Sequence, residues 1–230
     1  MTLPERLSSF VVAIDGPAGA GKSTVSRMLA EDLGYTLLDT GAIYRAVAFK
    51  ARERGADWQD GETIAQVATT LDIGFRLESD GSNRLFCDGQ DLSNLIRTPE
   101  VSQGASIVSA HPPVRAALLE LQRSMGRRGR VVAEGRDVGT VVFPDAGAKF
   151  FLTASVTERA HRRSLDLKSR GILEDIAVTQ AEIETRDARD SSRVASPLRQ
   201  ADDAVGIDSE AMTPRAVVAQ MAALVRQRGG

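Results

Sequence analysis

The sequence has little cysteine and few aromatic side chains. Cys87 is the only cysteine among 230 residues, so an internal disulfide is excluded, which fits a reducing compartment. Aromatic residues make up 4% of the chain, so the core must be built mainly from Val, Leu, Ile and Ala. We expect Cys87 to be a small apolar strand residue and not a reactive thiol.

An excess of charge of one sign is also lacking. The formal net charge is -2, which argues against a general nucleic-acid binder but is compatible with a local arginine cluster for small anions. No apolar run is long enough to span a membrane, and Met1–Arg6 lacks the basic start and apolar stretch of a secretory signal. We therefore expect a soluble, cytoplasmic protein without membrane or nucleic-acid partners. No strongly apolar surface stripe is evident, so we expect a monomer.

Short apolar runs rich in β-branched residues alternate with helical patterns along the chain. We predict buried strands at 10–14, 35–38, 130–133, 149–152 and 204–207. We predict helices at 22–32, 42–54, 60–70, 99–110, 114–125, 157–168, 175–189 and 214–226, with a break at 111–113 and a loop at 191–201. This order predicts an α/β fold with a parallel sheet covered by helices on both faces.

An antiparallel insertion interrupts this alternation. Ile73, Phe75 and Leu77 alternate with smaller or polar residues, 80–83 has the composition of a turn, and 85–87 is again apolar. We predict a hairpin here, with a third short strand after Asp88-Gly89.

A phosphate-binding loop follows the first predicted strand. The segment Gly16-Pro17-Ala18-Gly19-Ala20-Gly21-Lys22-Ser23 matches G-x-x-x-x-G-K-[ST] without a mismatch. Glycines allow consecutive backbone N–H groups to point into one concavity, and the start of the following helix adds partial positive charge. Lys22 would reach the outer phosphates of a nucleoside triphosphate, and the Ser23 hydroxyl would hold Mg²⁺. A chance glycine turn is a poor alternative, because the flanking strand and helix agree with the motif independently. The loop predicts a P-loop NTPase-type core.

Arginine recurs at positions that suit phosphate recognition, because its planar fork binds phosphate oxygens bidentately. Four groups stand out: Arg45; Arg136; Arg159, Arg162 and Arg163; and Arg186, Arg189 and Arg193. The alternative for each is a solvated charged face. Arg136 favours a ligand site, since it follows a buried strand at the sheet edge where α/β proteins bind ligands. For the group 159–163 the two interpretations are equally good.

Carboxylates also follow the predicted strands. Asp39 and Glu134 each end a strand close to where the phosphate loop should lie, and either could bind Mg²⁺ or its waters. Asp15, beside the loop, is a weaker candidate. The alternative for each is a helix-capping or salt-bridging carboxylate.

Four motifs together resemble those of bacterial cytidylate kinases (CMP/dCMP kinases) of the nucleoside monophosphate kinase family. They are Ile14–Ser23 (IDGPAGAGKS), Leu38–Arg45 (LDTGAIYR), Glu134–Thr140 (EGRDVGT) and Arg186–Arg193 (RDARDSSR). The resemblance covers nearly the whole chain, including the insertion after Leu71. The phosphate loop is shared by many families, whereas the other three motifs together are quite specific.

The resemblance implies a division into three parts. It implies a core at approximately 1–40, 128–156 and 200–230, a substrate-binding region with the β insertion at approximately 41–127, and an Arg-rich lid at approximately 157–172. The lid would close over ATP, and the insertion would belong to the substrate-binding region.

The resemblance also implies roles for individual residues. ATP would bind Gly16–Ser23, Thr24 and Arg162, and catalysis would depend on Lys22, Arg136, Arg159, Arg163 and Arg193. The cytidylate phosphate would be gripped by Arg45, Arg136 and Arg193, with Gly135 beside them. The cytosine ring would be read by Ser106, Arg115 and Asp137, and the sugar by Arg186 and Asp190 with Thr40 close by. Two positions depart from the family pattern: Thr40 stands where Ser is common, and Glu134 stands where Asp is common.

The implied activity is ATP-dependent, Mg²⁺-assisted phosphorylation of CMP and dCMP to the diphosphate by in-line phosphoryl transfer, giving ADP. One alternative is a kinase for adenylate, uridylate or shikimate on the same core. Another is a nucleotide-binding regulator without transfer activity. The arginines at 186–193 argue against the regulator, which would not need a second phosphate site.

Overall fold

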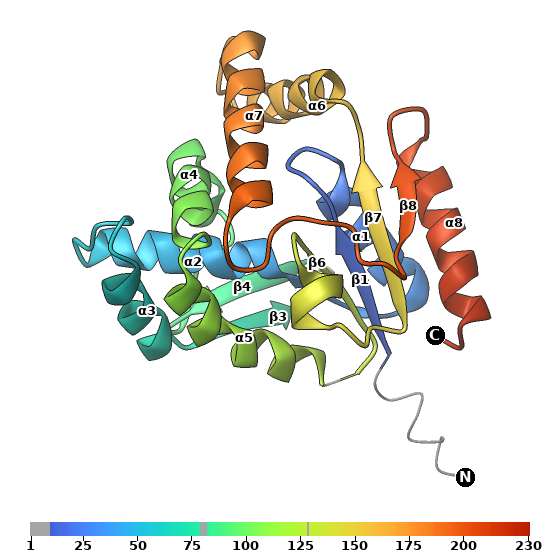
Figure 1. The fold of residues 1–230 in the computed structure, drawn as a ribbon, viewed down its shortest axis with the longest axis horizontal. Coiled ribbons are helices and arrows are strands. Elements are labelled where there is room, and N and C mark those ends of the chain that lie inside the picture. The colour runs from blue at the N-terminus through green and yellow to red at the C-terminus, as the bar shows by residue number, and fades with distance from the viewer. Residues whose placement is uncertain (1–9, 79–81, 128) are drawn as a thin grey trace. The chain divides into compact units, whose positions relative to one another are not determined.

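The computed structural model describes residues 10–78, 82–127 and 129–230 (Figure 1). By its internal contacts the chain divides into two compact units. The first unit comprises Met1–Leu37 and Gly126–Gly230, and the second comprises Leu38–Met125. The chain therefore leaves the first unit within the strand Thr36–Asp39 and returns to it at the end of the helix Pro112–Gly126.

A five-stranded parallel sheet forms the centre of the first unit. In spatial order its strands are β2 (Thr36–Asp39), β6 (Val131–Gly135), β1 (Val11–Asp15), β7 (Ala148–Thr153) and β8 (Val205–Asp208). β1 pairs in parallel with β6 and β7, and β7 pairs in parallel with β8. Strands buried on both faces need continuous apolar runs, which is why these segments could be predicted. The carboxyl ends of β1 and β6 meet at one sheet edge, which places the residues after them side by side.

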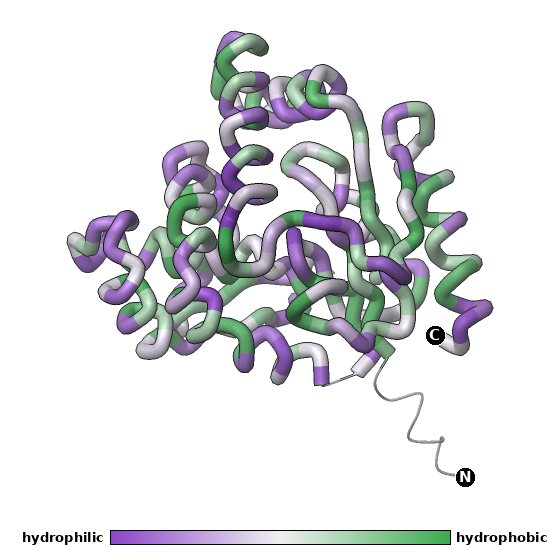
Figure 2. The backbone as a smooth tube through the Cα atoms, viewed as in Figure 1, coloured by the Kyte–Doolittle hydropathy of each residue, from purple (hydrophilic) through white to green (hydrophobic). Residues whose placement is uncertain are grey.

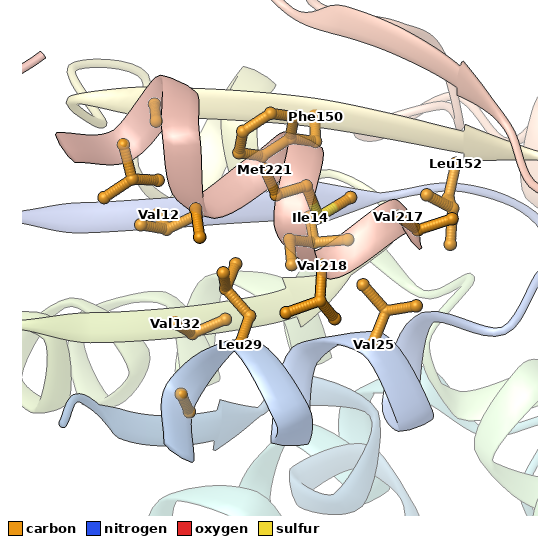
Figure 3. Close-up of a cluster of buried hydrophobic side chains, with 14 of the residues drawn as sticks. Val12, Ile14, Val25, Leu29, Val132, Phe150, Leu152, Val217, Val218 and Met221 are labelled. Carbon is orange, nitrogen blue, oxygen red and sulfur yellow. The ribbon is translucent and has the colours of Figure 1, made fainter. Parts of the chain in front are cut away.

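Two helices cover the apolar face of this sheet. α1 (Lys22–Leu33) packs against α8 (Pro214–Gln227), and both contribute to one core with β1 and β7. Figure 3 shows Ile14, Leu29 and Met221 meeting in this core, and each is fully buried. Burying such a side chain stabilises the fold by roughly 2 kcal/mol. Packing of the α1–α8 layer therefore fixes the helix that begins in the phosphate loop.

Helix ends in the first unit follow the expected capping chemistry. Gly34 closes α1 in the left-handed conformation, at φ 67°, and its N–H bonds the carbonyls of Ala30 and Glu31. Thr213 caps the start of α8, where Pro214 occupies the first turn. Two further helices, α6 (Val156–Ser169) and α7 (Ile176–Ser192), pack against each other. A single π-turn, η3 (Val138–Val142), follows β6.

The second unit consists mainly of helices around a small sheet. Its elements are α2 (Thr40–Glu53), α3 (Gly61–Thr70), β3 (Ile73–Leu77), β4 (Asn83–Cys87), β5 (Gln90–Asp91), η2 (Leu95–Arg97), α4 (Pro99–Val108) and α5 (Pro112–Gly126). β3, β4 and β5 form an antiparallel sheet, with Ile73 opposite Cys87. α2 packs against α3 and α4. The Trp58 ring lies against Gly104 of α4, where a Cβ atom would stand 2.5 Å from Trp58 Cζ2.

The predicted strands and helices are present, with shifted ends, and the fold class is confirmed. The predicted break between two helices at 111–113 is present but lies earlier: α4 ends at Val108 and α5 already begins at Pro112, because prolines are tolerated in a first helical turn. The loop predicted at 191–201 begins later, since α7 continues to Ser192. The predicted turn at 80–83 lies partly outside the described residues. Cys87 is fully buried in β4, and burial raises the pKa of its thiol to about 11, as suits a packing residue.

Hydropathy along the chain matches this arrangement. Figure 2 shows apolar residues concentrated in β1 and β7, and alternating polar and apolar stripes along α8. In the part of the chain that the structure describes, none of the helices combines the length and the apolar character that crossing a membrane requires.

Candidate active site

The turn between β1 and α1 has the backbone shape of a phosphate loop. Gly16, Gly19 and Gly21 have positive φ angles of 148°, 79° and 89°. A Cβ atom at Gly16 would lie 2.1 Å from the Leu152 carbonyl oxygen, and one at Gly19 would lie 3.0 Å from Arg159 Cβ. Only glycine fits these positions, so the loop conformation explains the sequence motif.

Lys22 lies inside this loop at the start of α1. The residue is 6% exposed, and its Nζ donates a hydrogen bond to the Pro17 carbonyl at 2.6 Å. Burial lowers the pKa of Lys22 well below its usual value, and the neighbouring charge of Arg136 lowers it further, while Glu134 opposes this shift. A buried ammonium group among cationic neighbours is suited to an incoming anion, which would stabilise its charged form.

Ser23 and Glu134 place hard oxygen ligands together next to the loop. The Ser23 hydroxyl donates to Glu134 Oε2 at 3.0 Å, and Glu134 is 4% exposed at the end of β6. A hydroxyl and a carboxylate suit Mg²⁺, which usually takes few protein ligands and completes its shell with phosphate and water. Among the described residues no group of three or more His, Cys, Asp or Glu side chains could hold a metal ion. The residues therefore fit an Mg²⁺ that arrives with a nucleotide.

Asp15 and Asp39, the other carboxylates considered for Mg²⁺, have different surroundings. Asp15 is buried and accepts the N–H groups of Val138 and Gly139. Asp39 caps α2 by accepting the Ala42 N–H at 2.9 Å. Both carboxylates therefore already accept backbone N–H groups. This agrees with the alternative interpretation, in which they serve the backbone and not a metal ion.

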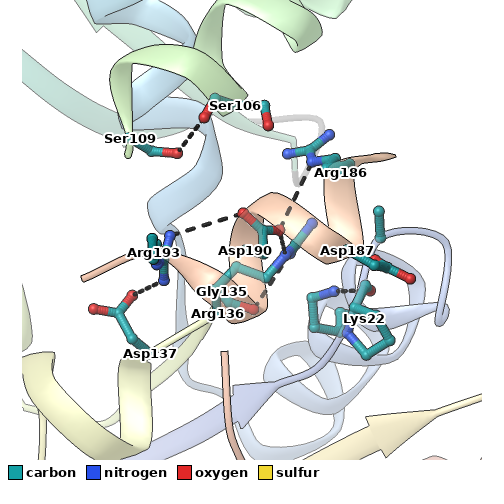
Figure 4. A network of polar contacts seen from close by, with 12 residues as sticks. Lys22, Ser106, Ser109, Gly135, Arg136, Asp137, Arg186, Asp187, Asp190 and Arg193 are labelled. Atoms are coloured by element: carbon teal, nitrogen blue, oxygen red, sulfur yellow. Dashed lines mark hydrogen bonds and ion pairs between the residues drawn. The ribbon is translucent and has the colours of Figure 1, made fainter. Parts of the chain in front are cut away.

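Charged side chains from the loop after β6 and from the end of α7 form a network in the first unit (Figure 4). Arg136 Nε donates to Asp190 Oδ2 at 2.9 Å, and Arg186 Nε lies 4.0 Å from the same oxygen. Arg193 Nη1 lies 3.8 Å from Asp190 Oδ1, and Arg193 Nη2 lies 3.7 Å from Asp137 Oδ1. Two members of the predicted arginine stripe, Arg186 and Arg193, therefore lie in this network with the residues after β6.

The balance of charge in this network favours anions. Burial raises the pKa of Asp190, but the charges of Arg136, Arg186 and Arg193 outweigh burial and hold it below the usual value. The three guanidinium groups face two carboxylates, Asp190 and Asp137, which leaves a net positive charge for a phosphate.

The arginines of α6 contact the phosphate loop and its surroundings in the same unit. Arg159 is 4% exposed, donates to the Ala18 carbonyl at 3.0 Å, and pairs with Asp187 of α7 at 2.6 Å. Arg162 pairs with Glu158 at 2.7 Å. Arg163 Nη1 lies 3.3 Å from Asp166 Oδ2, on the same helix. The side chains of Arg159 and Arg162 are therefore held by defined partners and do not form the solvated charged face of the alternative interpretation. The Arg163 side chain is partly exposed.

Two further residues were missed from the sequence. Ser209, after β8, accepts a hydrogen bond from Arg162 Nη1 at 3.0 Å on its hydroxyl and another from Nη2 at 2.9 Å on its carbonyl. The Ser209 hydroxyl also lies 3.1 Å from the Ala20 carbonyl, to which it donates. The position of Ser209 at the carboxyl end of a strand was an available signal. The second missed residue is Asp187, the partner of Arg159. Apart from the neighbouring arginines in the sequence, nothing marked Asp187 as a site residue.

Arg45 and Thr40 belong to the second unit, at the start of α2. Arg45 Nη2 donates to Asp39 Oδ2 at 2.7 Å, and the two side chains are 24% and 21% exposed. Thr40 is buried at the first position of α2. A Cβ atom at Gly41 would lie 3.1 Å from Asp39 Oδ1 and 3.4 Å from Arg45 Nη1, so glycine leaves room for this pair.

Ser106 and Arg115 are brought together in the second unit near the end of α4. The Ser106 carbonyl accepts the Ser109 hydroxyl at 3.3 Å (Figure 4). The Ser109 carbonyl accepts Arg115 Nη1 at 3.2 Å. The Arg115 guanidinium lies 5.4 Å from the centre of the Tyr44 ring. Ser106 and Arg115 are 3% and 8% exposed, so both are fixed by their surroundings.

The predicted site residues thus divide between the two units. The first unit holds the phosphate loop, Glu134, Arg136, Asp137, the α6 arginines, Arg186, Asp190 and Arg193. The second unit holds Thr40, Arg45, Ser106 and Arg115. Their convergence on one substrate remains a prediction.

Comparison with known proteins gives one family. The family model for cytidylate kinase matches residues 12–227. The cytidylate kinase of Syntrophotalea carbinolica is 49% identical over 219 residues, covering 95% of this chain and 93% of that protein. The cytidylate kinase of Geobacter sp. (strain M21) is 47% identical over 223 residues, covering 97% of this chain and 95% of that protein. A bifunctional pantoate ligase/cytidylate kinase of Synechococcus elongatus is 48% identical over 223 residues, covering 95% of this chain and 42% of that longer protein.

Proposed function

The chain belongs to the cytidylate kinase family, and on this premise we propose that it transfers the γ-phosphoryl group of ATP to the phosphate of CMP and dCMP. Phosphorylation of a nucleoside monophosphate by ATP follows from the family itself. The observation that supports the two-substrate mechanism is the Arg136–Asp190–Arg193 network in the same unit as the phosphate loop. It provides a cationic site additional to the one formed by the loop.

ATP would bind through the backbone N–H groups of Gly16–Gly21 and of Ser23 and Thr24. The start of α1 adds partial positive charge there. Lys22 would exchange the Pro17 carbonyl for β- and γ-phosphate oxygens. Ser23, with Glu134 acting through water, would hold Mg²⁺, which supplies charge neutralisation on the phosphates when it is bound.

The acceptor phosphate would be held by Arg45, Arg136 and Arg193, with Gly135 beside them. Arg136 and Arg193 now contact carboxylates, and the incoming phosphate would share these guanidinium groups. Arginine forks suit this exchange, because they have five donors and stay charged. The convergence of Arg45 on the same phosphate is the part of this proposal that a substrate-bound structure would test most directly.

The base and the sugar would be read by residues of both units. Asp137 would accept the exocyclic amino group of cytosine, and Ser106 and Arg115 would donate to its ring acceptors. A site built to hydrogen-bond one base rejects bases that leave its polar groups unpaired. Arg186 and Asp190 would hold the sugar hydroxyls.

Two residues set this chain apart from the family pattern. Thr40, in place of the common Ser, keeps the hydroxyl but adds a methyl group near the sugar. Glu134, in place of Asp, has a longer arm, which favours a water-mediated role at Mg²⁺.

The transfer would proceed in line through a loose transition state, so the protein contributes position and charge. Lys22, Arg159 and Arg163 would offset charge on the moving group, and Arg162 would contact ATP. No general base is required, because a phosphate monoester is already largely ionised at neutral pH. Closure of the lid, approximately 157–172, over the core would exclude water and suppress hydrolysis of ATP.

A panel of acceptors tests the proposal. ADP release from ATP would be measured with CMP, dCMP, UMP, AMP and shikimate at equal concentrations. We expect kcat/KM to be highest for CMP and dCMP. A preference for UMP, AMP or shikimate would contradict the cytosine assignment. Binding of ATP without transfer to any acceptor would favour a nucleotide-binding regulator.

A further inference from the structure

Asp15 ties two functional segments of the first unit together. It ends β1 directly before Gly16 and is 4% exposed. Its Oδ1 accepts the N–H of Val138 at 2.8 Å, and its Oδ2 accepts the N–H of Gly139 at 2.7 Å. These bonds join residues 123 and 124 positions apart in the sequence, so local geometry does not impose them. One carboxylate therefore fixes the phosphate loop to the turn η3.

The backbone that Asp15 holds is the one that directly follows Arg136 and Asp137. η3 begins at Val138, immediately after Asp137. The other end of this short segment is anchored at Glu134, which accepts a hydrogen bond from the phosphate loop. A displacement of the Val138 N–H group would therefore move the two side chains proposed to hold the phosphate and the base of the acceptor.

Close packing leaves this connection little freedom. A Cβ atom at Gly16 would lie 2.1 Å from the Leu152 carbonyl oxygen, so the start of the phosphate loop is confined against β7. A Cβ atom at Gly139 would lie 3.3 Å from Asp15 Oδ2 and 3.2 Å from Lys149 Cδ. Neither loop can shift without disturbing a contact near Asp15.

The chemistry of the contact requires a carboxylate. Two backbone N–H groups point at one side chain, and only Asp or Glu offers two acceptor oxygens there, whereas Asn would turn an NH₂ group toward one of them. Burial raises the pKa of Asp15 to about 6, while the bonds from Gly139 and Val138 oppose this effect. A buried negative charge repels phosphorylated substrates, so the contribution of Asp15 to a phosphate site must be geometric.

We propose that Asp15 is a positioning residue for the acceptor monophosphate. By holding the N–H groups of Val138 and Gly139, it sets Arg136 and Asp137 at a fixed offset from the phosphate loop. This inference rests on the proposed function, because it assigns the acceptor to those two side chains. A purely structural role would affect both substrates alike or affect stability alone.

Steady-state kinetics of Asp15→Asn separate these roles. We expect the KM for CMP to rise about tenfold and kcat to fall severalfold, because a small misplacement of orienting groups is costly. The KM for ATP should stay within about twofold, since the start of the phosphate loop remains confined against the Leu152 carbonyl of β7. The matched control is Asp32→Asn, which removes a carboxylate of the same unit that pairs with Arg226 at 2.7 Å on the surface. The control should leave both KM values unchanged.

A second variant tests the same contact without changing charge. Gly139→Ala adds a methyl group against Asp15 Oδ2, and we expect the KM for CMP to rise about threefold, again without a matching rise for ATP. Circular dichroism would establish which variants fold. If Asp15→Asn does not fold, the KM values of Gly139→Ala test the positioning role of Asp15. Equal changes in both KM values, or no change, in the folded variants would overturn the inference alone. Wild-type protein that fails to phosphorylate CMP would overturn the proposed function, and this inference with it.

Discussion

Arg193 and Asp137 form a buried ion pair, with Nη2 and Oδ1 3.7 Å apart and side chains that are 3% and 6% exposed. The pair joins the end of α7 to the loop after β6. Removing one member of a buried pair leaves the other charge uncompensated, which is costly. The residue proposed to grip the acceptor phosphate and the residue proposed to read its base therefore stabilise each other before substrate arrives.

Arg193→Met should lower kcat/KM for CMP by at least about two orders of magnitude, because a cation that holds and orients the attacking phosphate is lost. The protein should still fold, with a loss of about 3 kcal/mol in the free energy of unfolding, because Asp137 and Asp190 each lose one guanidinium partner. Kinetics and urea unfolding would measure the two effects. Arg199→Met, which removes a guanidinium that is 59% exposed, is the control and should match wild type. A near-normal rate for Arg193→Met would remove Arg193 from the mechanism.

Local chemistry explains what the sequence could predict. The phosphate loop was predictable because positive φ angles demand glycine at fixed spacings and a helix start follows. Arg136 could be placed at a ligand-binding edge because it follows a buried parallel strand. Whether Arg193 shares one helix face with Arg186 depended on where α7 ends, and the sequence did not specify that end.

Long-range bonds explain what the sequence could not predict. The first N–H group of the π-turn η3, that of Val138, donates to the carboxylate of Asp15, which lies 123 residues earlier in the chain. Arg162 finds both of its Ser209 partners 47 residues away, after the last strand. Such contacts arise only when separate elements meet in the folded chain, so no sequence period reveals them.

Asp137→Asn should weaken the preference for cytosine over uracil. Cytosine presents an amino donor where uracil presents a carbonyl, and Asn can donate to that carbonyl whereas an ionised Asp cannot. We expect the ratio of kcat/KM for CMP to that for UMP to fall about tenfold. Parallel assays of both substrates would measure it, with Asp32→Asn as a surface control. An unchanged ratio would place Asp137 outside base recognition.

Ser23→Ala should raise the Mg²⁺ requirement of the reaction. The Ser23 hydroxyl lies 3.0 Å from Glu134 Oε2, and the substitution removes the proposed direct ligand of the ion. We expect the Mg²⁺ concentration for half-maximal rate at fixed ATP to rise at least about tenfold. A titration of Mg²⁺ against initial rate would measure it.

Ser26→Ala is the matched control for that titration, since Ser26 lies one turn further along α1. Its hydroxyl is fully buried and has no hydrogen-bond partner among the described residues. Its removal should leave the Mg²⁺ requirement unchanged and stabilise the fold by about 1 kcal/mol. A rise in Mg²⁺ requirement equal to that of Ser23→Ala would mean that α1 itself, and not the Ser23 ligand, is responsible.

Asp15 should give the stability of the protein a distinct pH dependence. Burial raises the pKa of Asp15 from 3.8 to about 6, so between these values the folded state binds more protons than the unfolded state. Stability from this group is therefore fully present below about pH 4 and is lost as pH rises through about 6. The loss amounts to about 3 kcal/mol, since each pKa unit corresponds to about 1.4 kcal/mol.

Other groups, including Asp190 with its lowered pKa, contribute with the opposite sign, so the effect must be isolated by difference. Asp15→Asn cannot titrate at this position. The free energy of unfolding of wild type minus that of Asp15→Asn should therefore fall by about 3 kcal/mol between pH 3 and pH 7.5. Urea unfolding at several pH values across this interval would measure it. A difference that stays constant would show that the Asp15 carboxyl keeps its ordinary pKa, with the Val138 and Gly139 bonds fully offsetting its burial.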